Sequence, residues 1–114
     1  MKKTALFCTA IFAMLCLQNC SSSKKTSKVA TISYATQIAP MMQASCAPCH
    51  FPPDGKKQAL NNYETVKSHV AEVIARVKLP QADPKFMPFK NKKPAFTEAE
   101  VAVLENWVKQ GMPQ

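Results

Sequence analysis

The sequence predicts an all-α fold, and two observations support that prediction. Residues 63–77 and 101–108 repeat apolar side chains at helical spacing, so each segment has one face suited to burial. No segment shows the strict alternation of apolar and polar residues that a half-buried strand requires. With 114 residues, the chain has room for one domain at most.

Residues 1–19 are predicted to be a signal peptide rather than part of the fold. Lys2 and Lys3 precede an apolar run over residues 5–17. That run is shorter than the ~20 residues of a membrane span and fits the apolar region of a secretory signal. A buried helix is the alternative, but the polar segment that follows offers it nothing to pack against.

The end of this run resembles a bacterial lipoprotein signal. Leu17 stands three residues before Cys20, although Asn19 replaces the small residue usual at that place. The resemblance implies an exported protein that is lipidated at Cys20 and held at a membrane, facing the periplasm or the cell surface. Residues 20–33 are rich in Ser, Lys and Thr, and we interpret them as the lipidated end and a flexible tether. The folded domain is expected over residues 34–114.

The first helix of the domain is expected from about Tyr34 into the segment "SCAPCH". Pro40 favours a late start or a kink in it. Its apolar contacts are predicted to be Ile38, Met41 and Met42. The following "FPPDGKK" is predicted to be a loop, because its prolines and glycine interrupt helices.

The second helix is expected to start near Asn61 or Asn62 and to end before Pro80. Asn61 and Glu64 have the spacing of a helix cap and its partner. The predicted buried stripe consists of Tyr63, Val66, Val70, Val73, Ile74 and Val77.

The last helix has the clearest signals. Thr97 and Glu100 have the spacing of a capping box, and Gly111 is suited to end the helix. The predicted buried stripe consists of Val101, Leu104, Trp107 and Val108. We interpret Trp107 as a core residue that packs against the first helix, and a role as an electron relay is the alternative.

The cysteines carry the functional signal. Two of the five leave with the signal peptide, and Cys20 is assigned to lipid, so Cys46 and Cys49 remain. They form the pattern C-x-x-C-H with His50, which is the attachment signature of c-type haem. Cysteines three apart lie on one side of a helical turn, so both sulfurs reach one porphyrin edge. The imidazole of His50 then projects toward the iron as its proximal ligand.

Other uses of these residues fit less well. A disulfide between Cys46 and Cys49 would close only a tiny loop. A zinc site needs about four ligands, and beyond His50 the only other histidine is His69. Exchange of the thioredoxin type is expected in a βαβ context, which the sequence does not contain.

A six-coordinate haem needs a second axial ligand, usually Met or His. Met87 lies in the Pro- and Lys-rich segment "DPKFMPFKNKKP", a composition that suits a loop crossing the open haem face. Pro88 fixes the backbone beside it. His69 is the alternative and lies at the border of the apolar stripe, where a partly solvated histidine without a ligand role is also expected.

Taken together, "CAPCH…PPDGKKQALNNYETV…FMPF…FTEAEVAVLENWVKQGMP" resembles the small class I cytochrome c domains of exported bacterial proteins. The shared features are C-x-x-C-H, a "Y-E-x-V" helix start, an M-P loop and a closing "W-V-x-x-G" helix, over residues 34–113. The resemblance implies three main helices around one covalently attached haem c. It also implies Met87 as the distal ligand.

Met–His ligation fills both axial positions, which favours electron transfer over oxygen chemistry. The expected function is therefore an electron carrier rather than an enzyme. A haem-based sensor of small ligands and a haem subunit of a larger oxidoreductase are the alternatives.

Charge indicates the kind of partner. The formal charge is +8 for the chain and +6 without Lys2 and Lys3. Four lysines surround Met87 in sequence: Lys85, Lys90, Lys92 and Lys93. They are expected either to steer acidic redox partner proteins or to form an ordinary solvated loop. Nucleic acid is not an expected partner, because stacking aromatics do not alternate with the basic residues.

Overall fold

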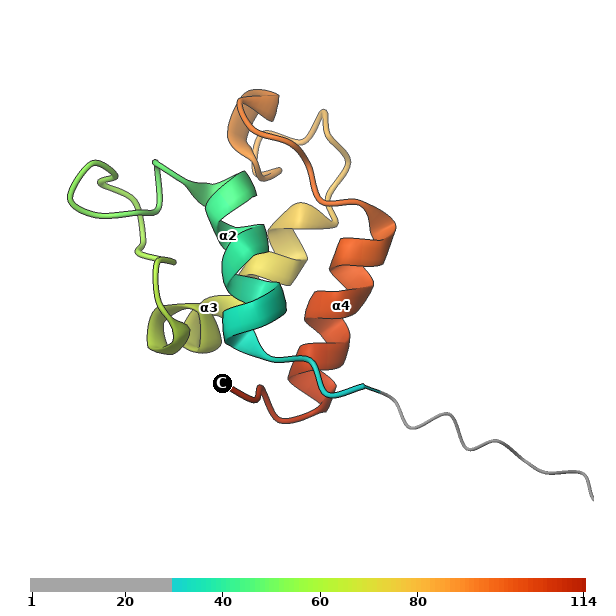
Figure 1. The fold of residues 1–114 in the computed structure, drawn as a ribbon. Coiled ribbons are helices and arrows are strands. Elements are labelled where there is room, and N and C mark those ends of the chain that lie inside the picture. Colours follow the sequence, from blue (N-terminus) through green and yellow to red (C-terminus); the bar gives the residue numbers. More distant parts are fainter. Residues whose placement is uncertain (1–29) are drawn as a thin grey trace, which may run out of the picture.

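The computed structural model of the protein describes residues 30–114 (Figure 1). Helices alternate with irregular segments over this range, and it contains no strand, which confirms the all-α fold class. The elements are η1 (Tyr34–Ile38), α2 (Ala39–Cys46), α3 (Tyr63–Val77), η2 (Phe89–Asn91) and α4 (Glu98–Lys109). Between residues 30 and 114, every helix is too short or too polar to cross a lipid bilayer. The predicted signal peptide and Cys20 lie outside the described residues.

The first helix begins at Tyr34 and has two parts. η1 is a π-helical turn, and α2 continues from it at Ala39 with Pro40 in its first turn. A proline is tolerated there because the amides of the first turn have no partner within the helix. The predicted kink or late start at Pro40 thus takes the form of a change in helix type. Ile38 and Met42 are fully buried, and α2 ends at Cys46, where the C-x-x-C-H motif begins.

α3 is capped one residue later than the sequence pattern indicated. The Asn62 side chain accepts a hydrogen bond from the Thr65 amide at 3.0 Å, and Thr65 Oγ1 accepts one from the Asn62 amide. The pairing of Asn61 with Glu64 was therefore wrong, although the helix starts where expected. Glu64 lies instead in the first turn, where the positive end of the helix dipole favours a carboxylate. The apolar stripe is confirmed, with Val66, Val70 and Val73 buried and its other members packed against the core.

α4 has the predicted signals at both ends. Thr97 Oγ1 accepts from the Glu100 amide, and the Glu100 carboxylate accepts from the Thr97 amide at 2.8 Å, which completes a capping box. Gly111 has φ +82°, and the amide of Met112 donates to the Trp107 carbonyl at 2.9 Å. This is a Schellman ending, and it needs a residue that tolerates the left-handed region.

Trp107 is a core residue, as predicted. Its side chain is fully buried and lies beside the rings of Tyr34 and Tyr63, with centroids 6.1 and 6.3 Å away. Its Nε1–H donates to the Pro113 carbonyl at 2.8 Å, so the one polar atom of the indole is satisfied. The indole therefore joins the first helix, α3 and the C-terminal residues.

The two ends of the described chain meet at the C-terminal end of α4. The Tyr34 amide donates to the Pro113 carbonyl at 3.0 Å, and the Ile32 amide donates to the Gln110 side chain at 2.8 Å. Ile32 is itself buried, so packing against the domain begins before Tyr34. In Figure 1 the segment of residues 80–97 lies at the opposite end of α4.

Candidate functional site

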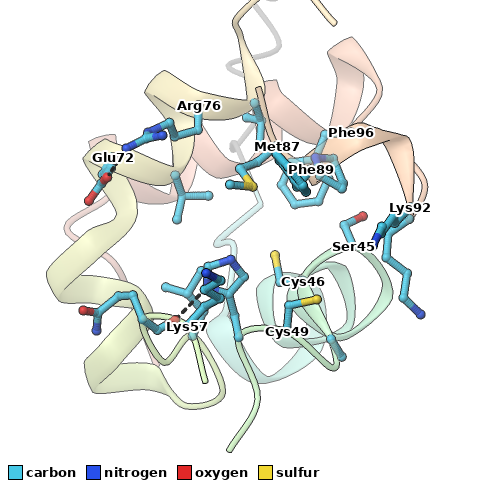
Figure 2. Close-up of a pocket in the computed structure, with 18 of the residues that line it drawn as sticks. Ser45, Cys46, Cys49, Lys57, Glu72, Arg76, Met87, Phe89, Lys92 and Phe96 are labelled. Carbon is cyan, nitrogen blue, oxygen red and sulfur yellow. Dashed lines mark hydrogen bonds and ion pairs between the residues drawn. The ribbon is translucent and has the colours of Figure 1, made fainter. Parts of the chain in front are cut away.

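The residues singled out by the sequence meet at one cavity of about 650 Å³. Cys46 lines it from the end of α2, Cys49 and His50 line it from the turn that follows, and Met87 lines it from the segment between α3 and α4. Figure 2 shows the Met87 sulfur facing the sulfurs of Cys46 and Cys49 across this space. The fold thus brings the C-x-x-C-H motif and the M-P loop together. Its apolar walls consist of Ala47, Leu60, Val73, Val77, Pro84, Pro88, Phe89 and Phe96.

The loop after the motif folds back onto it. The Lys57 amide donates to the Cys49 carbonyl at 3.2 Å, and the Leu60 amide donates to the His50 carbonyl at 2.9 Å. Gly55 makes this close return possible, because a Cβ at this position would collide with the carbonyls of Pro48 and Cys49. The loop therefore fixes the backbone of the motif from outside.

The same loop orients the imidazole of His50. Its Nδ1 lies 2.6 Å from the Gln58 carbonyl oxygen. A carbonyl only accepts, so Nδ1 carries a hydrogen, and in the neutral ring the lone pair is then on Nε2. Histidines that bind metals generally make this kind of hydrogen bond with the other ring nitrogen. The arrangement therefore prepares Nε2 to act as a ligand.

The two cysteines are free thiols in different surroundings. Cys46 is partly buried, and its burial raises the pKa of the thiol to about 11, whereas Cys49 is exposed. Thiol–disulfide exchange and zinc binding both use thiolates, which a lowered pKa favours. The surroundings of Cys46 have the opposite effect on its pKa.

Met87 is held between anchored neighbours. Phe86 is buried and its amide donates to the Asp83 carbonyl at 3.0 Å, and Pro88 is also buried. The Met87 amide is directed at the carbonyl of Arg76, near the end of α3, at 3.4 Å. The loop is thus attached to α3 at the residue whose sulfur faces the cavity.

One face of α3 forms a further wall of the cavity, and the sequence pattern predicts only part of it. The wall consists of His69, Glu72, Val73, Arg76 and Val77. His69 therefore opens onto the same cavity as Met87, and both candidate distal ligands are present. Arg76 donates to Glu72 at 2.9 Å, which places an ion pair at this wall. Helical spacing from His69 identifies these positions, but the pattern alone does not show that the face is turned toward a cavity.

Among residues 30–114, no three His, Cys, Asp or Glu side chains converge into a cluster that could hold a metal ion.

Comparisons with protein families, with curated proteins and with solved structures found no match to this chain. The resemblance to cytochrome c domains therefore stays a prediction that depends on the residues themselves.

Proposed function

We propose that this protein is a monohaem c-type cytochrome that carries electrons between protein partners at the exported face of a membrane. The observation that supports it most is the meeting of Cys46, Cys49, His50 and Met87 at one apolar cavity. The proposal implies that the domain has the small cytochrome c fold. It also includes lipid attachment at Cys20, which would hold the protein at the membrane.

The residues present fit a haem. Cofactor pockets typically measure about 300–1,000 Å³ and are mainly apolar with a few polar groups, and a cavity of about 650 Å³ with these walls agrees with that description. A haem takes only two iron ligands from the protein, so it needs no cluster of three or four ligating side chains. Cys46 and Cys49 would hold it covalently, and His50 with Met87 would take the axial positions.

Each of these residues has a definite task. His50 is oriented by its hydrogen bond to the Gln58 carbonyl, which also makes the imidazole a stronger electron donor. Met87 would close the opposite side of a bound haem, and the apolar side chains that line the cavity would keep water from its faces. When bound there, haem supplies a one-electron iron couple, whose potential is raised by a methionine ligand. The protein contributes position, burial and hydrogen bonding.

We assign the distal position to Met87 rather than to His69. In Figure 2 the Met87 sulfur faces the cysteines across the cavity. Met87 is also fixed by buried Phe86 and Pro88, so little entropy remains to be lost on ligation. His69 belongs to the wall formed by α3, and we interpret it as a partly solvated side chain beside the ring.

Peptide mass spectrometry tests haem attachment directly. The full chain is produced in a bacterial host that attaches c-type haem, and the digested protein is searched for the peptide spanning Cys46 to Cys49. We expect that peptide to carry one haem joined through both sulfurs. We expect Cys46→Ala to leave one thioether at most and the double variant Cys46→Ala/Cys49→Ala to leave none. A wild-type peptide without haem, in a host that matures a control cytochrome, would refute the proposal.

A further inference from the structure

We infer that the ion pair of Glu72 and Arg76 tunes the reduction potential of the proposed haem, with Arg76 as the charge that acts on the iron and Glu72 as the residue that positions it. The inference rests on the proposed electron-transfer function and identifies how the protein adjusts it. The iron gains one positive charge on oxidation, so a fixed cation near the cavity favours the reduced state and raises the potential.

Arg76 differs in kind from every other basic residue of the chain. The sequence has 15 lysine and arginine residues, and Arg76 is the one arginine among them. Its side chain lines the cavity. A guanidinium stays charged throughout the pH range in which proteins fold, and its planar set of donors holds a carboxylate in one geometry. The cavity wall therefore carries a permanent positive charge that a carboxylate can fix in place.

Glu72 supplies that carboxylate. Among the described residues that line the cavity it is the one acid, and its Oε1 accepts from the Arg76 guanidinium at 2.9 Å. The two residues are four positions apart on α3 with the acid first, which is the favourable order for such a pair. Figure 2 shows both side chains on the side of the cavity away from Cys46 and Cys49. The pair thus restricts where the guanidinium can lie.

Arg76 is also attached to the proposed distal ligand through its backbone. The Met87 amide is directed at the Arg76 carbonyl at 3.4 Å, and Arg76 lies in the last turn of α3. A cation is favourable there because the C-terminal end of a helix dipole is negative. The end of α3 therefore fixes the backbone of Met87 and the position of the charge together.

The size of the cavity places this charge within electrostatic reach of its contents. A sphere of about 650 Å³ is about 11 Å across, close to the Debye length of about 10 Å at 0.1 M salt. The Arg76 side chain is 36% exposed and that of Glu72 is 60% exposed, so solvent screens the carboxylate more than the guanidinium. The cation outweighs its partner, and the net effect of the pair is to raise the potential.

Redox titration of the full-length holoprotein in detergent tests the inference, with the visible spectrum reporting the oxidised fraction. At a fixed ambient potential and low salt, Arg76→Gln should raise the ratio of oxidised to reduced protein by about two- to fourfold, the effect of a unit charge about 10 Å away. Glu72→Gln should lower the ratio by a smaller factor. The double variant should lie between the two, and Arg76→Lys should stay closer to wild type than Arg76→Gln does.

The exposed pair of Lys78 and Glu105 provides matched controls, because neither residue lines the cavity. Their glutamine variants change the net charge by the same amounts as those of the cavity pair, and we expect clearly smaller shifts in the ratio. A pair that only stabilised α3 would change the urea midpoint and leave the potential unchanged. If Arg76→Gln unfolds, Glu72→Gln and Arg76→Lys still decide the question.

The outcomes separate this inference from the proposed function. A wild-type protein that titrates reversibly, with equal shifts for the two pairs or none for the cavity pair, would overturn the role of Arg76 and leave electron transfer in place. A shift of Arg76→Gln in the opposite direction would overturn it as well. A wild-type protein without haem, or with haem that cannot be titrated reversibly, would overturn the proposed function and the inference with it.

Discussion

The Nδ1 atom of His50 lies 2.6 Å from the carbonyl oxygen of Gln58, which fixes the ring of the proposed proximal ligand. The bond depends on a tight loop, because Gly55 is in contact with the carbonyls of Pro48 and Cys49. The loop that follows the motif is therefore part of the site, although none of its own side chains is a proposed ligand.

Replacing Gly55 tests that relationship. In Gly55→Ala the added methyl group must displace the backbone of the motif, which we expect to cost about 1–3 kcal/mol in the free energy of unfolding. The displaced loop should weaken the hydrogen bond at His50. A less electron-rich imidazole stabilises ferric iron less, so the reduction potential should rise.

Gly111→Ala is the matched control for Gly55→Ala. Gly111 has open space around its Cβ position but a φ of +82°, so alanine there should cost about 1–2 kcal/mol through backbone strain alone. Urea unfolding and redox titration separate the two effects. An unchanged potential in Gly55→Ala, or an equal change in Gly111→Ala, would contradict the role given to the loop.

The helix caps provide a second prediction. Asn62→Ala removes the side chain that accepts from the Thr65 amide, and Thr97→Ala removes the corresponding acceptor of α4. Each should lower the free energy of unfolding by about 1 kcal/mol. Asn61→Ala is the control and should change it by a few tenths at most, because Asn61 is not the cap. A larger loss for Asn61→Ala than for Asn62→Ala would contradict the observed start of α3.

These caps show how far the sequence could predict the fold. Thr97 with Glu100 was unambiguous, because no neighbouring residue competes for the cap. At α3 two adjacent asparagines compete for the position of the helix cap. Thr65 completes a capping box with Asn62 as well as Glu64 would with Asn61. The sequence does not discriminate between these two pairs, and the hydrogen bonds between Asn62 and Thr65 in the structure identify Asn62 as the cap.

The candidate site could be predicted from the sequence only in part. The candidate haem-binding residues Cys46, Cys49, His50 and Met87 come from local patterns, and the structure places all four at one cavity. Gln58 was not predictable, because a carbonyl oxygen is not specified by its side chain. The Arg76–Glu72 pair at the cavity wall depends on how α3 is rotated against its neighbours, which is a tertiary property.

A third prediction concerns pH. A hydrogen bond from Lys78 at 2.6 Å, together with the charge of Lys78, lowers the pKa of the Glu105 carboxyl. A carboxyl whose pKa is lower in the folded state stabilises the protein above its unfolded pKa of about 4.3. That stabilisation is lost as the pH falls through the lowered folded pKa.

The variant Lys78→Gln isolates this interaction. It should be slightly less stable than wild type near neutral pH, and the difference should shrink toward zero in acid and in high salt, because the pair is exposed. Urea unfolding between pH 3 and pH 7 measures this difference in the free energy of unfolding. The acid end of that range lies about one pH unit below the ordinary pKa of a glutamate carboxyl. A stability difference that grows as the pH falls would contradict the stabilisation assigned to the pair of Lys78 and Glu105.

A fourth prediction is that the domain needs its haem to fold. An enclosed apolar cavity costs about 24 cal/mol per Å³, so one of about 650 Å³ would cost about 15 kcal/mol if it stayed empty and sealed. The cavity opens to solvent, so this is an upper bound, but it matches the whole stability of a typical domain, about 5–15 kcal/mol. Cys46→Ala/Cys49→Ala should therefore be largely unfolded by circular dichroism. A cooperative melt equal to that of the holoprotein would contradict this prediction.

The most direct test of the central claim is the visible absorption spectrum of the exported protein, oxidised and then reduced. We predict a c-type reduced spectrum and, in the oxidised protein, the weak far-red band of methionine-ligated haem. Met87→Ala should abolish that band, and His69→Ala should leave it unchanged. A c-type spectrum whose oxidised form lacks the band would contradict Met87 as the distal ligand. Absence of haem absorption, in a host that matures other c-type cytochromes, would contradict the proposed function as a whole.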